Sequence, residues 1–263
     1  MRIVFVIFLL LLSENNSGHK TIATIPVSGH KTILTDNLNN FYLLTQGTLT
    51  KYSPFGKKVV SFSDGSLGNI TSADVTNPYR LILYYNNFNQ ILFLDDAMTI
   101  LAEPVLLDNY KLFSVRAVSY SPDDGFFIFD EDTYTIKHFN ESRKEDFESA
   151  SLYSYLKTHT DSIHLFFRTN RLFLFQPETG LLVFDETGNF IMPVKLSGNP
   201  RNITVGQTAL FYKNNEGKPI VFSLTTGQVT PFDTSGNISF NSFVETANNL
   251  IVANNNQVWV LKK

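Results

Sequence analysis

Residues 170–194 read NRLFLFQPETGLLVFDETGNFIMPV. Within this stretch, three apolar runs (172–175, 181–184 and 190–194) alternate with turn clusters that contain Gly, Pro, Asn and Asp. Short apolar runs between such clusters are typical of β-strands joined by tight hairpins. The stretch therefore predicts a three-stranded antiparallel meander, and a sheet of that size cannot hold a hydrophobic core alone. We expect it to pack against similar sheets formed elsewhere in the chain.

The same pattern recurs along the chain, and the third strand of each unit marks its phase. A bulky residue precedes a polar turn residue at Tyr52-Ser53, Leu94-Asp95, Phe139-Asn140, Phe184-Asp185, Phe222-Ser223 and Leu261-Lys262. These six markers lie about 38 to 45 residues apart. That spacing agrees with the period of roughly 40 to 45 residues in a four-stranded propeller blade.

The two ends of the chain complement each other. The last unit lacks an outer strand, whereas the run Thr21–Val27 precedes the first unit and belongs to none. Pairing Thr21–Val27 beside Gln257–Leu261 would complete the last blade, and a closed ring has no exposed sheet edge at the joint. The sequence therefore predicts an all-β fold, a six-bladed β-propeller of four-stranded antiparallel blades whose last blade is closed by the N-terminal strand. The alternatives are a β-sandwich and an open array of sheets.

The N-terminal residues have the pattern of a leader. Met1-Arg2 is a short basic start, residues 3–12 are ten apolar residues, and residues 13–18 are polar. An apolar segment of that length is short for a membrane span and is typical of a signal peptide. We expect a signal peptide at 1–18, a single propeller domain at 19–263, and an exported protein that is periplasmic or associated with the outer membrane. Because no Ala-x-Ala precedes the polar run, an uncleaved anchor or a buried N-terminal strand is the alternative.

Composition excludes several classes of function. The net charge of −3 leaves no basic surface for nucleic acid, so we expect no nucleic-acid partner. The chain has no Cys, which excludes disulfides, Cys-zinc sites and thiol nucleophiles. No later segment reaches the length of a membrane span, so no transmembrane segment is expected beyond the leader.

Motifs of catalysis and metal binding are absent from the sequence. Neither Gly-x-Ser-x-Gly nor a P-loop occurs, so we expect no enzyme and no cofactor. His159 and His164 could bind a metal only if the backbone folded sharply between them, and a loop His beside a strand His is the simpler interpretation. Residues 123–125 (DDG) and 130–132 (DED) could suggest calcium, but both lie at predicted turns, where Asp accepts backbone hydrogen bonds.

Propeller geometry places a binding site at the axis of the ring or on the loops around it. Asp74, Arg116 and His164 lie on predicted inner strands, with Asp161 nearby. We therefore predict a candidate ligand site at the channel mouth formed by Asp74, Arg116, Asp161 and His164. The alternative is that Asp74 and Arg116 form a buried pair whose charges satisfy each other. His138 is expected to be a strand-end histidine without a partner.

Residues 68–98 read GNITSADVTNPYRLILYYNNFNQILFLDDAM. Through DVTNP (74–78), ILYY (82–85), FNQI (88–91) and FLD (93–95), this stretch resembles a family of exported Bacteroidota six-bladed β-propeller proteins. The family has no agreed catalytic residues, so the resemblance transfers none. The chain also resembles, more distantly, the periplasmic accessory and plug subunits of the type 9 secretion translocon, which implies an interaction role.

These observations lead to two hypotheses about function. The first is an exported non-enzymatic propeller that acts as a protein-interaction scaffold or accessory subunit at the periplasm or outer membrane, with protein partners in the cell envelope. The alternative is a sensor or enzyme that binds a small ligand or glycan at the mouth of the propeller channel.

Overall fold

The computed structural model describes residues 19–29, 32–45, 47–156, 162–232 and 238–263. Three sequence-based expectations concern positions outside these ranges: the signal peptide of residues 1–18, His159 and Asp161. No helix in the described ranges has both the length and the apolar character needed to cross a membrane.

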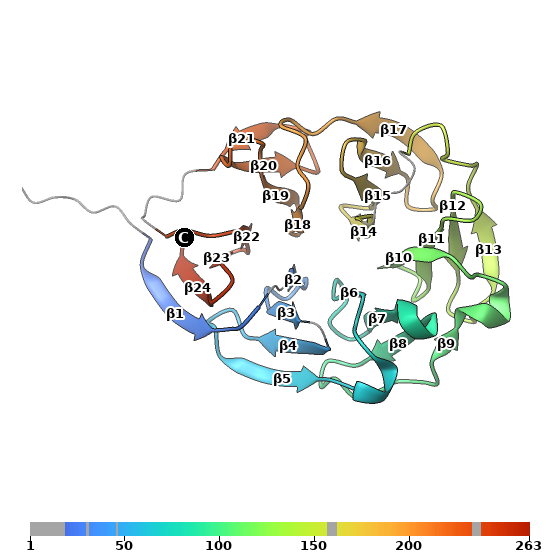
Figure 1. Ribbon diagram of the computed structural model, residues 1–263, viewed down its shortest axis with the longest axis horizontal. Coiled ribbons are helices and arrows are strands. Elements are labelled where there is room, and N and C mark those ends of the chain that lie inside the picture. The colour runs from blue at the N-terminus through green and yellow to red at the C-terminus, as the bar shows by residue number, and fades with distance from the viewer. Residues whose placement is uncertain (1–18, 30–31, 46, 157–161, 233–237) are drawn as a thin grey trace, which may run out of the picture.

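The chain forms six four-stranded antiparallel sheets arranged as a ring, which confirms the predicted six-bladed β-propeller (Figure 1). Blade 1 contains β2 (Thr32–Thr35), β3 (Phe41–Thr45), β4 (Thr48–Tyr52) and β5 (Lys58–Phe62). Blade 2 contains β6 (Ser72–Asp74), β7 (Leu81–Tyr85), β8 (Gln90–Leu94) and β9 (Val105–Leu106). Blade 3 contains β10 (Val115–Tyr120), β11 (Phe126–Asp130), β12 (Thr135–Phe139) and β13 (Glu145–Glu148).

The other three blades follow the same plan. Blade 4 contains β14 (His164–Arg168), β15 (Arg171–Gln176), β16 (Gly180–Phe184) and β17 (Phe190–Val194). Blade 5 contains β18 (Thr204–Val205), β19 (Ala209–Lys213), β20 (Pro219–Ser223) and β21 (Val229–Pro231). Blade 6 contains β22 (Ser242–Glu245), β23 (Asn249–Ala253), β24 (Gln257–Lys262) and β1 (Thr21–Pro26). The helical segments of the described ranges are the 3-10 turns Gly65–Leu67, Asn86–Phe88 and Leu107–Tyr110.

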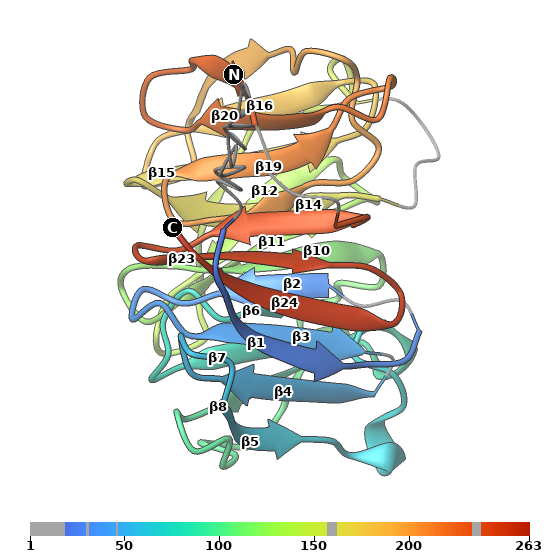
Figure 2. The same ribbon diagram turned by 90° about the vertical axis from the view of Figure 1, so that its left-hand side faces the viewer.

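Strand β1 closes the ring by pairing with the last strand of the chain, as the sequence predicts. It runs antiparallel to β24, with Thr24 opposite Trp259 and Ile25 opposite Val258 (Figure 2). Just beyond β1, the Val27 N–H donates to the Asn256 carbonyl at 2.9 Å. The two ends of the chain are therefore held in one sheet, which removes the free edge that an open ring would leave.

Apolar layers hold neighbouring blades together, and the layers on the two sides of blade 6 merge into one cluster. Strands β7, β8 and β11 are buried along their whole length, which explains why their sequences are continuous apolar runs rather than alternating ones. Between blades 2 and 3, the rings of Phe93 and Phe126 meet with centroids 5.9 Å apart. Burying one such side chain contributes about 1.5 to 3 kcal/mol, so these layers are the main source of stability.

The six inner strands line a central channel and define its two ends. Each blade begins at its innermost strand and runs outward, so all six inner strands point the same way along the channel. The starts of the inner strands surround one opening, here named the His164 mouth after the first residue of β14. Their ends surround the other opening, named the Arg168 mouth after the last residue of that strand.

Candidate functional site

Arg168 joins four blades at the Arg168 mouth. Its Nε donates to the Gly206 carbonyl of blade 5 at 3.1 Å, and its Nη1 donates to the Phe167 carbonyl of its own blade at 2.8 Å. Its Nη2 reaches the Thr35 carbonyl of blade 1 at 3.4 Å, and Nη1 also donates to Thr76 Oγ1 beyond β6. Burial lowers the pKa of the Arg168 guanidinium and nearby Asp74 opposes that effect. An arginine stays charged even so.

Asp74, the last residue of β6, lies at the same mouth and is fully satisfied. Its Oδ2 accepts from Ser119 Oγ and from the Tyr120 N–H, each at 3.0 Å. Its Oδ1 accepts from the Thr76 N–H at 2.8 Å and from Thr76 Oγ1. The Thr76 hydroxyl thus accepts from Arg168 and donates to Asp74, so it connects the buried cation to the buried anion. This arrangement holds both charges in place and leaves neither one to bind a ligand.

The alternative interpretation, in which Asp74 and Arg116 form a buried pair, is wrong, and the two residues do not share one channel mouth either. Arg116 is the second residue of β10, near the His164 mouth, whereas Asp74 ends β6 at the opposite mouth. Arg116 Nε instead donates to Glu131 Oε2 at 2.5 Å, and its side chain is 47% exposed. A residue near the start of one inner strand and a residue at the end of another cannot meet, because the strands run in the same direction.

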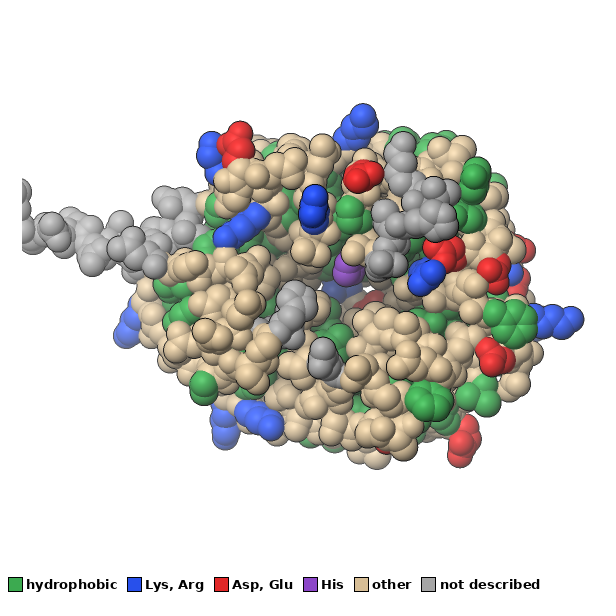
Figure 3. All heavy atoms as spheres, viewed as in Figure 1, with side chains coloured by type: hydrophobic (Ala, Val, Ile, Leu, Met, Phe, Trp, Pro, Cys, Tyr) green, Lys and Arg blue, Asp and Glu red, His purple; other side chains and the backbone are tan. Residues whose placement is uncertain are grey.

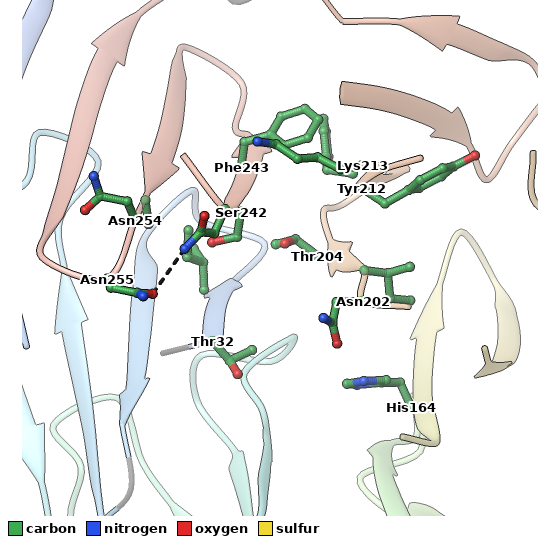
Figure 4. Close-up of a pocket in the computed structure, with 15 residues that line it drawn as sticks. Thr32, His164, Asn202, Thr204, Tyr212, Lys213, Ser242, Phe243, Asn254 and Asn255 are labelled. Atoms are coloured by element: carbon green, nitrogen blue, oxygen red, sulfur yellow. Dashed lines mark hydrogen bonds between the residues drawn. The ribbon is translucent and has the colours of Figure 1, made fainter. Parts of the chain in front are cut away.

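The His164 mouth contains a cavity of about 190 Å³ between blades 1, 4, 5 and 6 (Figure 4). Figure 3 shows this face of the ring, with a histidine side chain at the centre. The polar side chains that line the cavity are Thr32, His164, Asn202, Thr204, Tyr212, Lys213, Asn241, Ser242, Asn254 and Asn255. Among them, Asn241 Nδ2 donates to Asn255 Oδ1 at 3.1 Å.

His164 is the one predicted site residue that lines this cavity. Its side chain is exposed to the channel, and the protein atoms packed around the channel partly desolvate the ring, which lowers the pKa of His164. The imidazole is therefore neutral near pH 7, with one nitrogen that donates and one that accepts. Deeper in the channel, a second space of about 80 Å³ separates His164 from Arg168 and is walled mainly by apolar residues such as Leu34, Ala73 and Val205.

A metal site would need several ligands that converge. Within the described ranges, no group of three or more His, Asp or Glu residues is placed to hold a metal ion. The acidic residues at the turns accept backbone hydrogen bonds, as the sequence predicts. Asp123 Oδ1 accepts from the Gly125 N–H at 3.1 Å, and Asp130 Oδ1 accepts from the Asp132 N–H at 3.1 Å.

His138 has partners, so the expectation that it stands alone is wrong. Its Nδ1 lies 2.6 Å from Asp146 Oδ1, and its Nε2 lies 3.0 Å from Ser121 Oγ and 3.2 Å from Asp123 Oδ1. The group borders a cavity of about 460 Å³ beside Phe127 and other residues of blades 3 and 4. A Ser-His-Asp relay requires the histidine nitrogen to be hydrogen-bonded to the serine hydroxyl. Here Asp123 and Ser121 share His138 Nε2, so the geometry does not define Ser121 as a nucleophile. The network ties the loop after β10 to the outer strand β13.

The loops around the Arg168 mouth differ from blade to blade in exposed apolar area. Five large hydrophobic side chains stand out on the hairpin loops of blades 1 and 2, here named the blade 1–2 apolar surface: Leu38 (51% exposed), Phe55 (70%), Tyr79 (63%), Ile100 (48%) and Leu101 (48%). The corresponding loops of blades 3 to 5 and the first hairpin loop of blade 6 (246–248), all within the described ranges, carry no large exposed hydrophobic residue.

No protein-family model and no curated protein sequence matches the chain. Solved structures of other propellers do match its fold. The virginiamycin B lyase of Staphylococcus aureus is 10% identical with a TM-score of 0.56, over 92% of this chain and 99% of that one. A streptogramin B lyase is 14% identical with a TM-score of 0.56, over 91% and 84%. The WD40 domain of Neurospora crassa Pan2 is 11% identical with a TM-score of 0.53, over 89% and 90%. At these identities the likeness concerns the fold alone.

Proposed function

We propose that this chain is an exported, non-enzymatic propeller that serves as an interaction scaffold or accessory subunit in the cell envelope. Its partner is a protein, and the docking site is the blade 1–2 apolar surface. The observation that carries this proposal is the concentration of five large exposed hydrophobic side chains on neighbouring loops of two adjacent blades. Single exposed hydrophobic residues are common on any protein, whereas clusters of them mark interaction sites.

The loops that carry this surface are held rigid by their own polar residues. Asp36 Oδ1 accepts from the Leu38 N–H at 2.9 Å, and Asn77 Oδ1 accepts from the Tyr79 N–H at 3.0 Å. In the turn that precedes Ile100, Asp95 Oδ1 accepts from the Ala97 N–H at 3.0 Å. Side chains presented on ordered turns lose little conformational entropy on binding, which favours recognition of a partner.

Two further observations support the non-enzymatic and exported parts of the proposal. The buried charges of the channel, Arg168 and Asp74, are both engaged in holding blades together. The leader of residues 1–18 and the resemblance to exported Bacteroidota propellers support a location in the periplasm or at the outer membrane. Fractionation of the cells that make the protein tests this location, since recovery in the cytoplasmic fraction alone would contradict it.

The docking site can be tested by site-specific photo-crosslinking in cells. We expect a benzophenone side chain at Phe55 or Tyr79 to give one crosslinked product of defined mass. The control is Thr225, an exposed residue on the equivalent face of blade 5 whose side chain forms no hydrogen bond in the described chain, and it should give no product. The double variant Phe55→Ser, Tyr79→Ser should lose the partner on co-purification. Equal products at all three positions, or none at any, would contradict the proposal.

A further inference from the structure

Five polar side chains converge on the cavity at the His164 mouth without hydrogen-bond partners. They come from four blades and lie around one space: Thr32, His164, Asn202, Thr204 and Ser242 (Figure 4). None of their side-chain polar atoms forms a hydrogen bond within the described part of the chain. Because their donors and acceptors face one space and are not used by the protein itself, a ligand that forms hydrogen bonds can contact several of them at once.

The charge of the cavity indicates a neutral occupant. No Asp or Glu is among the fifteen residues that line it. Its one cationic side chain, Lys213, donates from Nζ to the Phe240 carbonyl and lies 4.2 Å from the centroid of the Phe240 ring, so it is already engaged. Desolvation lowers the pKa of His164 below its ordinary value, so the imidazole adds no positive charge to the cavity near neutral pH.

The available groups match the hydroxyls of a sugar. The hydroxyls of Thr32, Thr204 and Ser242 can each donate and accept, as can the amide of Asn202 and the neutral imidazole of His164. Neighbouring hydroxyls of a sugar ring also donate and accept, so they complement such a lining. The volume of about 190 Å³ is below the roughly 300 to 1,000 Å³ of pockets for drug-sized ligands, which limits the occupant to about one ring.

We propose that the His164 mouth binds a neutral carbohydrate, with one sugar ring held by Thr32, His164, Asn202, Thr204 and Ser242. The site is on the opposite face of the ring from the blade 1–2 apolar surface. It therefore does not rest on the proposed protein docking, and either proposal can fail without the other.

The binding test uses the full chain and a panel of single sugars. Saturation-transfer NMR and calorimetry would compare glucose, galactose, mannose and N-acetylglucosamine with the charged sugars glucuronate and glucosamine. We expect at least one neutral sugar to bind at millimolar concentration or below, and its charged counterpart to bind at least about tenfold more weakly. Absence of binding by every neutral sugar, or tighter binding of a charged one, would overturn the proposal.

Substitutions separate this cavity from adventitious binding elsewhere on the surface. Asn202 is exposed, so Asn202→Leu should fold normally and weaken sugar binding by up to about tenfold, the effect of one lost hydrogen bond. His164→Leu should weaken it similarly, and His164→Gln should restore part of the affinity. Thr225→Val, on the other face, is the matched control. Sugar binding that survives both Asn202→Leu and His164→Leu would overturn the proposal.

Discussion

The two mouths of the channel are built from the same six strands but are chemically opposite. At the Arg168 mouth the charged groups are satisfied: Arg168 donates to three backbone carbonyls and a hydroxyl, and Asp74 accepts from Thr76, Ser119 and Tyr120. At the His164 mouth, polar side chains such as Asn202 face a cavity and have no partner in the described residues. The first mouth stabilises the ring, and the second is free to bind.

Connection length explains this difference. At the Arg168 mouth the inner strand turns back through a short hairpin, such as Thr169–Asn170 between β14 and β15. At the His164 mouth the chain arrives from the outer strand of the preceding blade, for example over residues 195–203 before β18. Short hairpins bring fixed backbone carbonyls close to the axis, where an arginine can bind them. Long connections vary more readily, and binding residues are commonly found on them.

Removal of the guanidinium should have the largest effect on stability. Arg168→Met leaves the carbonyls of Thr35 and Gly206 without their donor and leaves Asp74 without a nearby cation. We expect the free energy of unfolding to fall by about 3 to 5 kcal/mol, measured by urea denaturation. Arg168→Lys, which keeps the charge but not the planar fork, should lose less. A free energy within about 0.5 kcal/mol of the wild type for Arg168→Met would contradict the assigned role.

Removal of the carboxylate should have the next largest effect. Asp74→Ala removes the acceptor for the Tyr120 N–H and for the hydroxyls of Ser119 and Thr76. A buried donor left unsatisfied costs about 1 to 3 kcal/mol, so we expect a loss in that range in the same urea experiment. The double variant with Arg168→Met should lose less than the sum of the two single losses, because the residues share Thr76. Strict additivity would show that the two residues act separately.

A third expectation concerns the pH dependence of stability, to which His164 at the opposite mouth contributes. Desolvation holds the pKa of folded His164 below the ordinary value of 6.5. Below about pH 6.5 the unfolded chain therefore takes up a proton that the folded chain does not, and stability is lost as the pH falls. His164→Gln should reduce the slope of unfolding free energy against pH by at most about 1.4 kcal/mol per pH unit in this window. Identical slopes in urea titrations between neutral and mildly acidic pH would contradict this expectation.

The smallest effect should come from Arg116. Its contact with Glu131 is half exposed, and exposed ion pairs contribute about 0 to 1 kcal/mol. Arg116→Ala should therefore change the free energy of unfolding by less than about 1 kcal/mol, and added salt should make even that difference smaller. A loss comparable to that of Arg168→Met would mean that Arg116 has a role in the channel after all.

The fold could be predicted from the sequence because its signals are local and repeated. The apolar runs and turns of residues 170–194 specify one meander, and similar units recur at the spacing of propeller blades. The strand at Thr21–Pro26 had no other partner than the incomplete last unit, so ring closure followed from counting strands.

The site was only partly predictable, because Arg168 and His138 bind atoms whose positions cannot be inferred from the sequence. His164 could be found as a titratable residue on an inner strand. Arg168 precedes the hairpin Thr169–Asn170, and such a charge is usually solvated. Its partners are mostly backbone carbonyls from other blades, such as that of Gly206. The partners of His138 were missed for a related reason, since Ser121 lies across the sheet in a separate loop.

The difference between the two mouths can be measured in one experiment, the hydrogen exchange of side-chain N–H groups by NMR. Arg168 Nε–H is bonded inside the channel, whereas Asn202 Nδ2–H₂ is exposed and has no partner in the described chain. We predict that the Arg168 signal exchanges far more slowly than that of Asn202, and that a bound neutral sugar slows the exchange of Asn202 alone. Exchange of Arg168 as fast as that of Asn202 would contradict the claim that one mouth is closed by its own hydrogen bonds and the other is open to a ligand.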